Sequence, residues 1–536
     1  MKRTIHPLLL SVISGVLLPL GWTGAATGPA LLAGFVPLLM AEYRISNEIG
    51  RFPSFAVFIN GFIAFLVWCT IVLWGALYVS IVALCACVLV TTLFMSITFW
   101  LFHQVRRKLG DGFGYFALIV FWLCFEYFYQ EGEISFPWLN LGSGLSNNIH
   151  IIQWYEYTGV FGGSLWILLS NVLIFRIIIN YLYRKERSRR PGLPAILAVT
   201  ILFPVAVSII MFYTYHEKSA PCEIVILQPN LDPYKEKFDT ADADIQTDIL
   251  LRQADSLTGE NTRFIIAPET AIPEGVWLDQ INDNKHITGI IHFLREHPDV
   301  RFIAGMNTSQ LYPDKESASG TAHIYYDGPE YFDYYNSALQ LESDGSVQVC
   351  HKSKLLIGPE KMPYSHLFGF MESLVVDMGG FVGSNGIQEQ RTVFSSEKDT
   401  VRVAPVICYE SVFGDYITEY IQKGAHFIAV ITNDGWWSDS PIYKQHLGFS
   451  RLRAVETRRS IARSANTGTS CFINQRGEIP KRTEFWKRTA ISGEINANDT
   501  LTFYVRNGDF IPRTAVFFGI IILLYMGVNS FKKRKV

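Results

Sequence analysis

Residues 401–410 have the sequence Val-Arg-Val-Ala-Pro-Val-Ile-Cys-Tyr-Glu. The apolar run 401–407 is short and rich in β-branched residues, which predicts a buried strand. A thiol, Cys408, follows this strand directly, and a carboxylate, Glu410, comes two residues later. Because a group at the end of a rigid strand is held in place and can still be exposed, this stretch predicts both a sheet and a reactive site at its edge.

Two other apolar strands end in polar groups in the same way. Strand 263–267 ends at Pro268-Glu269, and strand 426–432 ends at Asn433-Asp434-Gly435. Further strands are predicted at 223–227 and 301–305, in a hairpin over 334–350 and in a pair over 461–479, with helices near 241–256, 284–296, 411–423 and 444–458. Strands that alternate with helices indicate a layered α/β fold.

Long apolar runs flank this water-soluble part of the chain. Eight runs have the length that crosses about 30 Å of hydrocarbon. They lie near 7–22, 29–43, 53–77, 80–104, 114–130, 161–183, 194–214 and 512–530, and the first two are short enough to form a tight hairpin. The division predicted is a membrane domain at 1–215, a catalytic domain at 222–496, a final span at 512–530 and a basic tail at 531–536.

Basic residues orient these spans. They occur before the first span and after the second, fourth, sixth and eighth, at Lys2 and Arg3, Arg44 and Arg51, Arg106 to Lys108, Arg184 to Arg190, and Lys532 to Lys535. The short loops 23–28 and 78–79 carry no lysine or arginine, and neither does 131–160. The positive-inside rule makes the basic side cytoplasmic, so the α/β domain is predicted on the outer face of the membrane.

The overall composition excludes several functional classes. The formal net charge of −2 does not favour nucleic acid as a partner. The eight cysteines have neither the spacing of metal ligands nor that of a disulfide framework. Phosphate-binding glycine loops of the Walker or dinucleotide type are also missing from the sequence, so no metal and no cofactor are expected.

Three segments together carry the chemistry. They are Ala267 to Pro273 around Glu269, Cys350 to Glu360 around Lys352, and Val406 to Glu410 around Cys408. Each residue alone has an ordinary structural explanation, such as a helix-entry carboxylate, a solvated lysine or a small buried thiol. With their flanking residues, the three segments resemble the Glu, Lys and Cys motifs of the nitrilase, or carbon–nitrogen hydrolase, superfamily.

The membrane spans narrow this resemblance to the apolipoprotein N-acyltransferase family, over nearly the whole chain. The stretches 431–437, 445–456 and 464–468 are also similar to that family's pattern. The resemblance implies a polytopic α-helical membrane domain joined to a nitrilase-like αββα sandwich. It also implies transfer of an acyl chain through a thioester on cysteine.

The resemblance assigns roles residue by residue. Cys408 is expected to be the nucleophile, Glu269 the general base and Lys352 the cation that stabilises the oxyanion, with the N–H after Cys408 as a second donor. Supporting roles fall to Glu360, Tyr409 and Glu410. Residues expected to line the substrate site and exclude water from the thioester are Phe238, Asn433, Trp436 and Trp437.

The sequence departs from the family pattern around Lys352. Lys354 stands where the family has a histidine, and residues 357–359 precede Glu360 in place of the usual segment. Lys354 therefore competes with Lys352 as the oxyanion partner, although the spacing to Glu360 favours Lys352. A pairing of Cys408 with His446 is a further alternative for activating the thiol.

The function implied is transfer of a fatty acyl chain from a phospholipid to the α-amine of the lipid-modified N-terminal cysteine of a lipoprotein. The expected location is the periplasmic side of a bacterial inner membrane, and the enzyme is expected to be a monomer. Two alternatives stay open: a membrane-tethered amidase that uses water as acceptor, and a non-enzymatic assembly protein with an inactive nitrilase fold.

Overall fold

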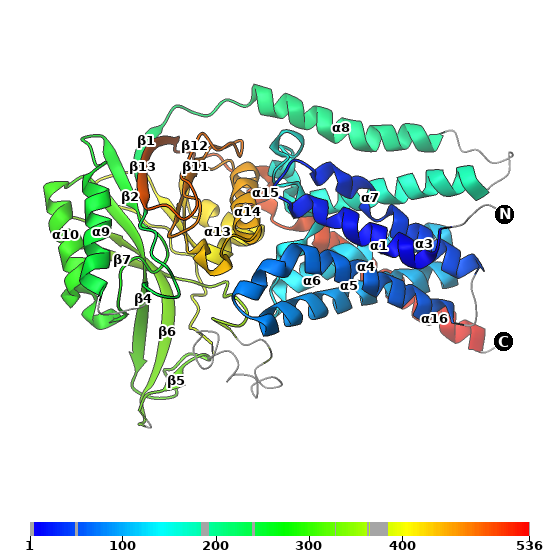
Figure 1. Cartoon of the computed structure of the whole chain (residues 1–536), viewed down its shortest axis with the longest axis horizontal. Helices are drawn as coiled ribbons and strands as arrows, with labels where there is room; N and C mark the ends of the chain where they lie inside the picture. The colour runs from blue at the N-terminus through cyan, green and yellow to red at the C-terminus, as the bar shows by residue number, and fades with distance from the viewer. Residues whose placement is uncertain are drawn as a thin grey trace.

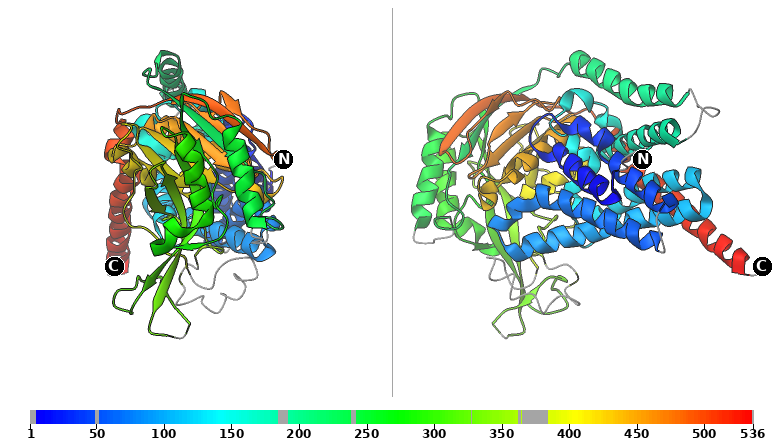
Figure 2. Two further views of the ribbon diagram at one scale, coloured as in Figure 1. Left: turned by 90° about the vertical axis from the view of Figure 1, so that its left-hand side faces the viewer. Right: turned by 45° about the vertical axis from the view of Figure 1, so that its right-hand side comes forward.

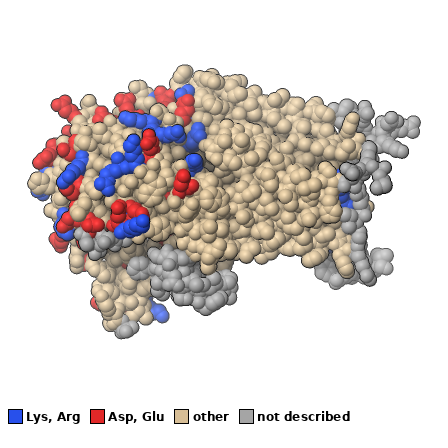
Figure 3. Space-filling view, viewed as in Figure 1, with Lys and Arg blue, Asp and Glu red and all other residues tan. Residues whose placement is uncertain are grey.

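The computed structural model describes residues 5–48, 52–183, 192–237, 242–326, 328–361, 364 and 384–534. Its helical part and its α/β part lie end to end (Figure 1). Both chain termini lie at the end of the helical part that is remote from the sheets, also seen in Figure 2. On the face shown in Figure 3, the charged side chains gather on the α/β part, whereas the described surface of the helical part is largely uncharged.

Six helices of the described chain are long and apolar enough to cross a membrane. The helical part consists of α1 (Pro7–Leu17), α2 (Leu31–Gly34), α3 (Val36–Glu48), α4 (Pro53–Leu73), α5 (Ile81–Leu109), α6 (Asp111–Glu131), α7 (Tyr155–Tyr183), α8 (Gly192–Thr214) and α16 (Phe510–Arg534). Helix α4 continues as a 3-10 turn to Tyr78. Six of the eight predicted spans thus form helices of spanning length.

The first two predicted spans form shorter elements. Helix α1 has 11 residues and ends in a 3-10 turn, and the second apolar run is divided between α2 and α3. The two runs pack tightly because Gly34 has no side chain: an added Cβ would lie 2.8 Å from Leu18 Cδ2. Ser14 Oγ also donates to the Gly34 carbonyl and accepts from Leu38 N at 3.2 Å. The tight hairpin expected from the sequence is therefore present.

The first sheet of the α/β part has the strand order β13-β1-β2-β4-β6-β5, with β3 paired to β4 and β7 to β6. Strands β1, β2 and β4 are parallel to one another, β3 pairs with β4 in parallel, and β13, β6, β5 and β7 join antiparallel. The strands are β1 (Pro221–Gln228), β2 (Thr262–Ile266), β3 (Val276–Trp277), β4 (Arg301–Tyr312), β5 (His323–Ile324), β6 (Tyr331–Leu341), β7 (Val347–His351) and β13 (Thr489–Asn496).

The second sheet has the order β12-β11-β10-β9-β8, of which β8, β9 and β10 are parallel. Its strands are β8 (Val403–Ile407), β9 (Phe427–Thr432), β10 (Ile461–Ala465), β11 (Cys471–Ile473) and β12 (Lys481–Arg482). The two sheets pack face to face, for example through the rings of Phe264 and Phe427, whose centroids are 5.0 Å apart. Residues on β8, β9 and β10 are buried throughout, as expected for parallel strands covered on both faces.

Helices cover both outer faces and complete an αββα sandwich. Helices α9 (Ala243–Asp255) and α10 (Lys285–Glu296) cover the first sheet, and α13 (Gly414–Gln422) and α14 (Ile442–Thr457) cover the second (Figure 1). Helix α10 shows why these segments form: Asn284 caps it by accepting from two backbone N–H groups, and its apolar residues recur with helical spacing at Ile287, Ile290, Ile291 and Leu294.

Helix α14 differs from the other covering helices because it is buried on nearly all sides. One side packs on the second sheet and the other on the helical part, so α14 joins the two parts of the chain. Gln445 makes the central contact: its Oε1 accepts from Trp138 Nε1 at 2.7 Å, and its Nε2 lies 3.3 Å from the carbonyls of Trp22 and Val72. A buried amide is thus one of the contacts that join the α/β part to the helices, beside those of Glu456 and Arg458.

Replacing Gln445 tests that contact. Gln445→Leu leaves the indole N–H of Trp138 and two carbonyls unpaired, at a cost of about 1–3 kcal/mol for each buried group. We expect a lower midpoint of thermal unfolding in detergent micelles than for the wild type. The exposed neighbour Lys444 supplies the control Lys444→Leu, and equal midpoints for the two variants would contradict the assignment.

Candidate active site

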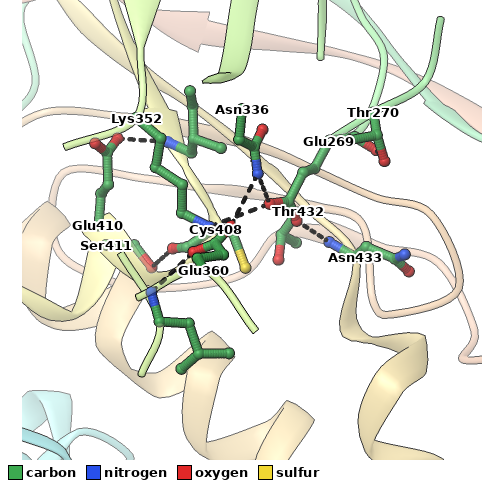
Figure 4. Close-up of polar contacts among 12 residues, drawn as sticks. Glu269, Thr270, Asn336, Lys352, Glu360, Cys408, Glu410, Ser411, Thr432 and Asn433 are labelled. Atoms are coloured by element: carbon green, nitrogen blue, oxygen red, sulfur yellow. Dashed lines mark hydrogen bonds and ion pairs between the residues drawn. The ribbon is translucent and has the colours of Figure 1, made fainter. Parts of the chain in front are cut away.

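Three sequence-predicted residues meet where strands of both sheets end. Glu269 follows β2, Lys352 follows β7 and Cys408 follows β8. Lys352 Nζ lies 3.3 Å from Glu269 Oε1 and 2.7 Å from Glu360 Oε1. Figure 4 shows Glu269 and Lys352 pointing toward the thiol of Cys408. The tertiary structure therefore brings together a carboxylate, an ammonium and a thiol, although Lys352 lies 83 residues after Glu269 and Cys408 lies a further 56 residues along the chain.

Glu269 is 6% exposed and is held at both of its oxygens. Oε1 accepts from Asn336 Nδ2 at 2.7 Å, and Oε2 accepts from the backbone N–H of Asn433 at 3.0 Å. The loop after β2 approaches β4 so closely that a Cβ on Gly305 would lie 2.6 Å from Glu269 Cα. Glu269 is thus held by hydrogen bonds. Its loop can approach β4 this closely only because residue 305 is a glycine.

Lys352 is 2% exposed and carries its charge between two carboxylates. Burial opposes that charge, but Glu360 and Glu269 outweigh burial and hold the pKa of Lys352 above its ordinary value. Glu360 also accepts from Asn336 Nδ2 at 3.2 Å and from Leu356 N at 2.8 Å. A permanently charged ammonium is available to an anion that forms at the thiol.

The Cys408 backbone adopts φ 51°, in the left-handed region that non-glycine residues rarely occupy. Burial raises the pKa of its thiol well above the ordinary value and Glu269 raises it further, whereas Lys352 and a hydrogen bond with Thr432 lower it. The resting thiol is therefore protonated, and a nucleophilic attack requires a base beside it. Glu269 is the carboxylate positioned to accept that proton.

The two residues after Cys408 have different surroundings. Glu410 is fully buried and accepts from Ser353 N at 2.7 Å and from Ile407 N at 2.8 Å, so it ties the Lys352 loop to β8. Tyr409 faces the helical part and donates from its hydroxyl to the Ser135 carbonyl at 2.9 Å. Both predicted supporting residues thus hold backbone segments next to the thiol.

The four residues predicted to line the substrate site have separate positions. Asn433 contacts Glu269 through its backbone, as described above, and Trp436 packs edge-on against Tyr234 with ring centroids 5.1 Å apart. Trp437 is half-buried against the apolar core. Phe238 lies outside the described residues.

Two alternatives were considered from the sequence: Lys354 as the oxyanion partner and His446 as the partner of the thiol. Both side chains make other contacts. Lys354 Nζ lies 3.7 Å from Glu131 Oε2 on α6 and above the ring of Phe413, at the junction with the helical part. His446 Nε2 lies 3.1 Å from the backbone carbonyl of Cys408, and its Nδ1 lies 2.8 Å from Asp434 Oδ1. The ammonium beside Glu269 and Glu360 is that of Lys352.

Sequence reasoning missed three residues at this site. Asn336 lies in the middle of β6, which also contains Asp333, Ser337 and Gln340, so a polar residue at this position gave no distinct signal. Lys237 is 4% exposed and donates from Nζ to the Glu269 carbonyl at 2.7 Å, and burial lowers its pKa to about 8. Thr432 is the last residue of β9. Among the described residues, no group of His, Cys, Asp or Glu side chains could hold a metal ion.

The sequence of the chain is similar to two known protein families. Residues 14–173 match the model of the apolipoprotein N-acyltransferase N-terminal domain, and residues 254–502 match that of carbon–nitrogen hydrolases. The apolipoprotein N-acyltransferase of Chlorobaculum tepidum is 28% identical over 538 residues, which cover 98% of this chain and 97% of that protein. That of Geobacter metallireducens is 28% identical over 94% of this chain and 91% of its own length.

The chain thus combines an apolipoprotein N-acyltransferase N-terminal domain with a carbon–nitrogen hydrolase domain. This confirms the resemblance seen in the sequence, the nitrilase-like α/β fold and the class of enzyme, an acyltransferase. With six helices of spanning length, the chain is a multi-pass membrane protein. Among solved structures, a nitrilase-superfamily protein of Saccharomyces cerevisiae is 13% identical with a TM-score of 0.35, covering 52% of this chain and 91% of its own.

The two lysines near the site provide a matched test of their roles. Lys352→Met leaves Glu269 and Glu360 facing each other without a cation, and loss of a charge at the oxyanion costs about 10²- to 10³-fold in rate. Lys354→Met removes a contact at the domain junction, so its rate should stay within about threefold of wild type. Single-turnover acylation of Cys408 measures both, and the reverse order would reassign the oxyanion cation to Lys354.

The raised pKa of the thiol predicts how Cys408 reacts with iodoacetamide. Because only the thiolate reacts, alkylation at pH 7 should be slower than for free cysteine and should continue to rise above pH 9. Glu269→Gln removes a charge that raises the thiol pKa, so alkylation at a given pH should become faster. Peptide mass spectrometry at Cys408 gives the rates, and a plateau below pH 8 would contradict the assignment.

Proposed function

We propose that this enzyme transfers an acyl chain from a phospholipid, through a thioester on Cys408, to the α-amine of the lipid-modified N-terminal cysteine of a lipoprotein. The catalytic residues are Glu269, Lys352 and Cys408, supported by Glu360, Tyr409 and Glu410. The curated relatives named apolipoprotein N-acyltransferase support this choice of acceptor.

The main support for this proposal is the position of Cys408 next to the helical part. Tyr409, the residue next to Cys408, stacks on Trp138 at 6.4 Å and 11°, and Trp138 stacks on Phe136 at 6.4 Å and 12°. Phe136 in turn contacts Tyr129 of the spanning helix α6 edge-on. Aromatic rings therefore extend from the nucleophile to a spanning helix, where a lipid-anchored substrate would lie. An amidase acting on a soluble substrate has no use for this arrangement.

The first half-reaction forms the acyl-enzyme. Glu269 takes the thiol proton as Cys408 Sγ attacks the ester carbonyl of the phospholipid, and the carbonyl π electrons become an oxyanion. Lys352 Nζ and the backbone N–H of Tyr409 stabilise that oxyanion. When the tetrahedral intermediate collapses, the ester C–O bond breaks, Glu269 returns its proton to the leaving alkoxide, and a lysophospholipid departs.

The second half-reaction uses the same groups in reverse. The free α-amine of the lipoprotein attacks the thioester carbonyl, and Glu269 accepts a proton from the attacking nitrogen. Collapse breaks the C–S bond, forms the amide and returns the proton to Cys408 Sγ. Water must stay away from the thioester between the two steps, which is the role proposed for Trp436, Trp437 and Phe238.

We also propose that the α/β domain lies on the periplasmic side of a bacterial inner membrane. The turn between α4 and α5 touches the α/β part, since Gly75 lies against Ser440. Helix α5 has 29 residues, about 43 Å, and it ends with the exposed Arg107 and Lys108. These cations are therefore remote from the α/β domain, and the positive-inside rule makes their side cytoplasmic. The proposed catalytic residues come from one chain, which supports a monomer.

Intact-protein mass spectrometry tests the function. The purified enzyme, incubated with phospholipid vesicles, should gain the mass of one fatty acyl chain, and neutral hydroxylamine should remove it. Cys408→Ala should gain no such mass while remaining folded, as judged by circular dichroism. Addition of a synthetic peptide with a diacylglyceryl-modified N-terminal cysteine should discharge the wild-type enzyme and yield an N-acylated peptide. Discharge to free fatty acid alone would instead support the amidase-like hydrolase.

A further inference from the structure

His446 lies beneath the nucleophile and belongs to a buried polar cluster with Ser411, Asp434 and Arg463. We propose that His446 is a positioning residue for the oxyanion hole: it donates a hydrogen bond to the carbonyl of Cys408 and so orients and polarises the peptide whose N–H belongs to Tyr409. This inference rests on the proposed acyl-transfer chemistry at Cys408 and adds a residue to it.

The contacts of His446 Nε2 require a hydrogen on that atom. Nε2 lies 3.1 Å from the Cys408 carbonyl and 3.0 Å from Ser411 Oγ, and Ser411 Oγ donates to the same carbonyl at 2.8 Å. A carbonyl oxygen only accepts, and a serine hydroxyl has a single hydrogen to give. Nε2 therefore donates, and the Cys408 carbonyl receives one hydrogen bond from His446 and one from Ser411.

The other nitrogen also faces an acceptor. Nδ1 lies 2.8 Å from Asp434 Oδ1, while Asp434 Oδ2 pairs with Arg463 Nη2 at 2.8 Å. Although burial opposes its charge, Arg463 and His446 hold the pKa of Asp434 well below the ordinary value. Arg463 Nη2 also lies 3.2 Å from His446 Nδ1. Asp434 and Arg463 together thus hold the imidazole ring at Nδ1 and direct Nε2 at the Cys408 carbonyl.

A hydrogen bond at this carbonyl acts on the N–H across the same peptide. The peptide unit is planar and conjugated, and in its trans form the C=O and N–H point to opposite sides. Donors on the oxygen draw electron density toward it, which makes the N–H of Tyr409 a stronger donor. Cys408 begins the 3-10 helix η10 (Cys408–Val412), and the first N–H groups of a helix have no acceptor within it. The N–H of Tyr409 is therefore available to an oxyanion.

The hydrogen bonds to the Cys408 carbonyl also maintain the unusual backbone conformation of Cys408. The φ of 51° at Cys408 is unfavourable for a residue with a Cβ and persists only where neighbouring contacts hold it. Two donors on the carbonyl supply such contacts, whereas the contact for the thiol itself comes from Thr432. His446 thus acts on the peptide of Cys408, and the thiol proton is left to Glu269.

Three variants separate this role from a structural one. His446→Leu removes the donor, His446→Gln keeps an N–H donor of similar reach, and His286→Leu replaces a buried histidine on the remote helix α10 as control. Two rates are measured at Cys408: single-turnover acylation by p-nitrophenyl butyrate, which passes through an oxyanion, and alkylation by iodoacetamide as a function of pH, which does not.

We expect His446→Leu to lower the maximal acylation rate by about 10²-fold, as for loss of an oxyanion-hole donor, without raising the half-saturating ester concentration. His446→Gln should recover part of that loss, and the pH profile of alkylation should match wild type in all three variants. An acylation rate for His446→Leu within threefold of that of His286→Leu would overturn the proposal. A shifted alkylation profile would also overturn it and make His446 a base for the thiol.

The ester probe keeps this test separate from the proposed function. If the wild type is acylated by p-nitrophenyl butyrate but never by phospholipid, the proposed donor is wrong, while the comparison of His446 variants still decides the role of His446. Loss of both acylation and alkylation in His446→Leu, with His286→Leu unaffected, would mean that His446 maintains the fold of the site as a whole, and would overturn its assignment to the oxyanion hole.

Discussion

The ammonium of Lys352, buried between the carboxylates of Glu269 and Glu360, is the interaction on which the rest of the site depends. Two carboxylates this close would repel each other without a cation between them. Lys352 offsets that repulsion and holds both side chains beside the thiol. The same ammonium lowers the pKa of the Cys408 thiol. A single buried charge therefore lies beside the base of our proposal and would face the oxyanion formed at the thiol.

Around this charge, the site is built from backbone groups more than from side chains. Asn433 holds Glu269 through its N–H, Glu410 joins Ser353 to Ile407, and in our proposal His446 acts on the carbonyl of Cys408. Backbone groups of packed strands move little, so they preserve a geometry that needs precision. The helical part contributes from the other side, since Trp138 contacts both Gln445 and Tyr409. Membrane anchoring and catalytic geometry are thus coupled through α14.

The fold was largely predictable because its elements carry strong local signals. Apolar runs of membrane length, and short apolar strands that end in polar groups, need no tertiary information to be recognised. Strand β13 was not predicted because Thr489–Asn496 is half-exposed and alternates weakly, so only its pairing with β1 defines it. The first predicted span agrees with the apolar helix Pro7–Trp22, whereas hydropathy did not show that the second is interrupted around Gly34.

At the site, the sequence by itself predicted the three residues that we propose to carry the chemistry: Glu269, Lys352 and Cys408 each lie in a recognisable segment at the end of a strand. It left Lys352 and Lys354 in competition, because residues two apart in a chain that leaves a strand can point in different directions. Only the tertiary structure placed one ammonium between two carboxylates and the other against Glu131. Only the tertiary structure also revealed Asn336, Lys237 and the contact of His446 with the Cys408 carbonyl. These groups are close in space but far apart in sequence, so they leave no pattern along the chain.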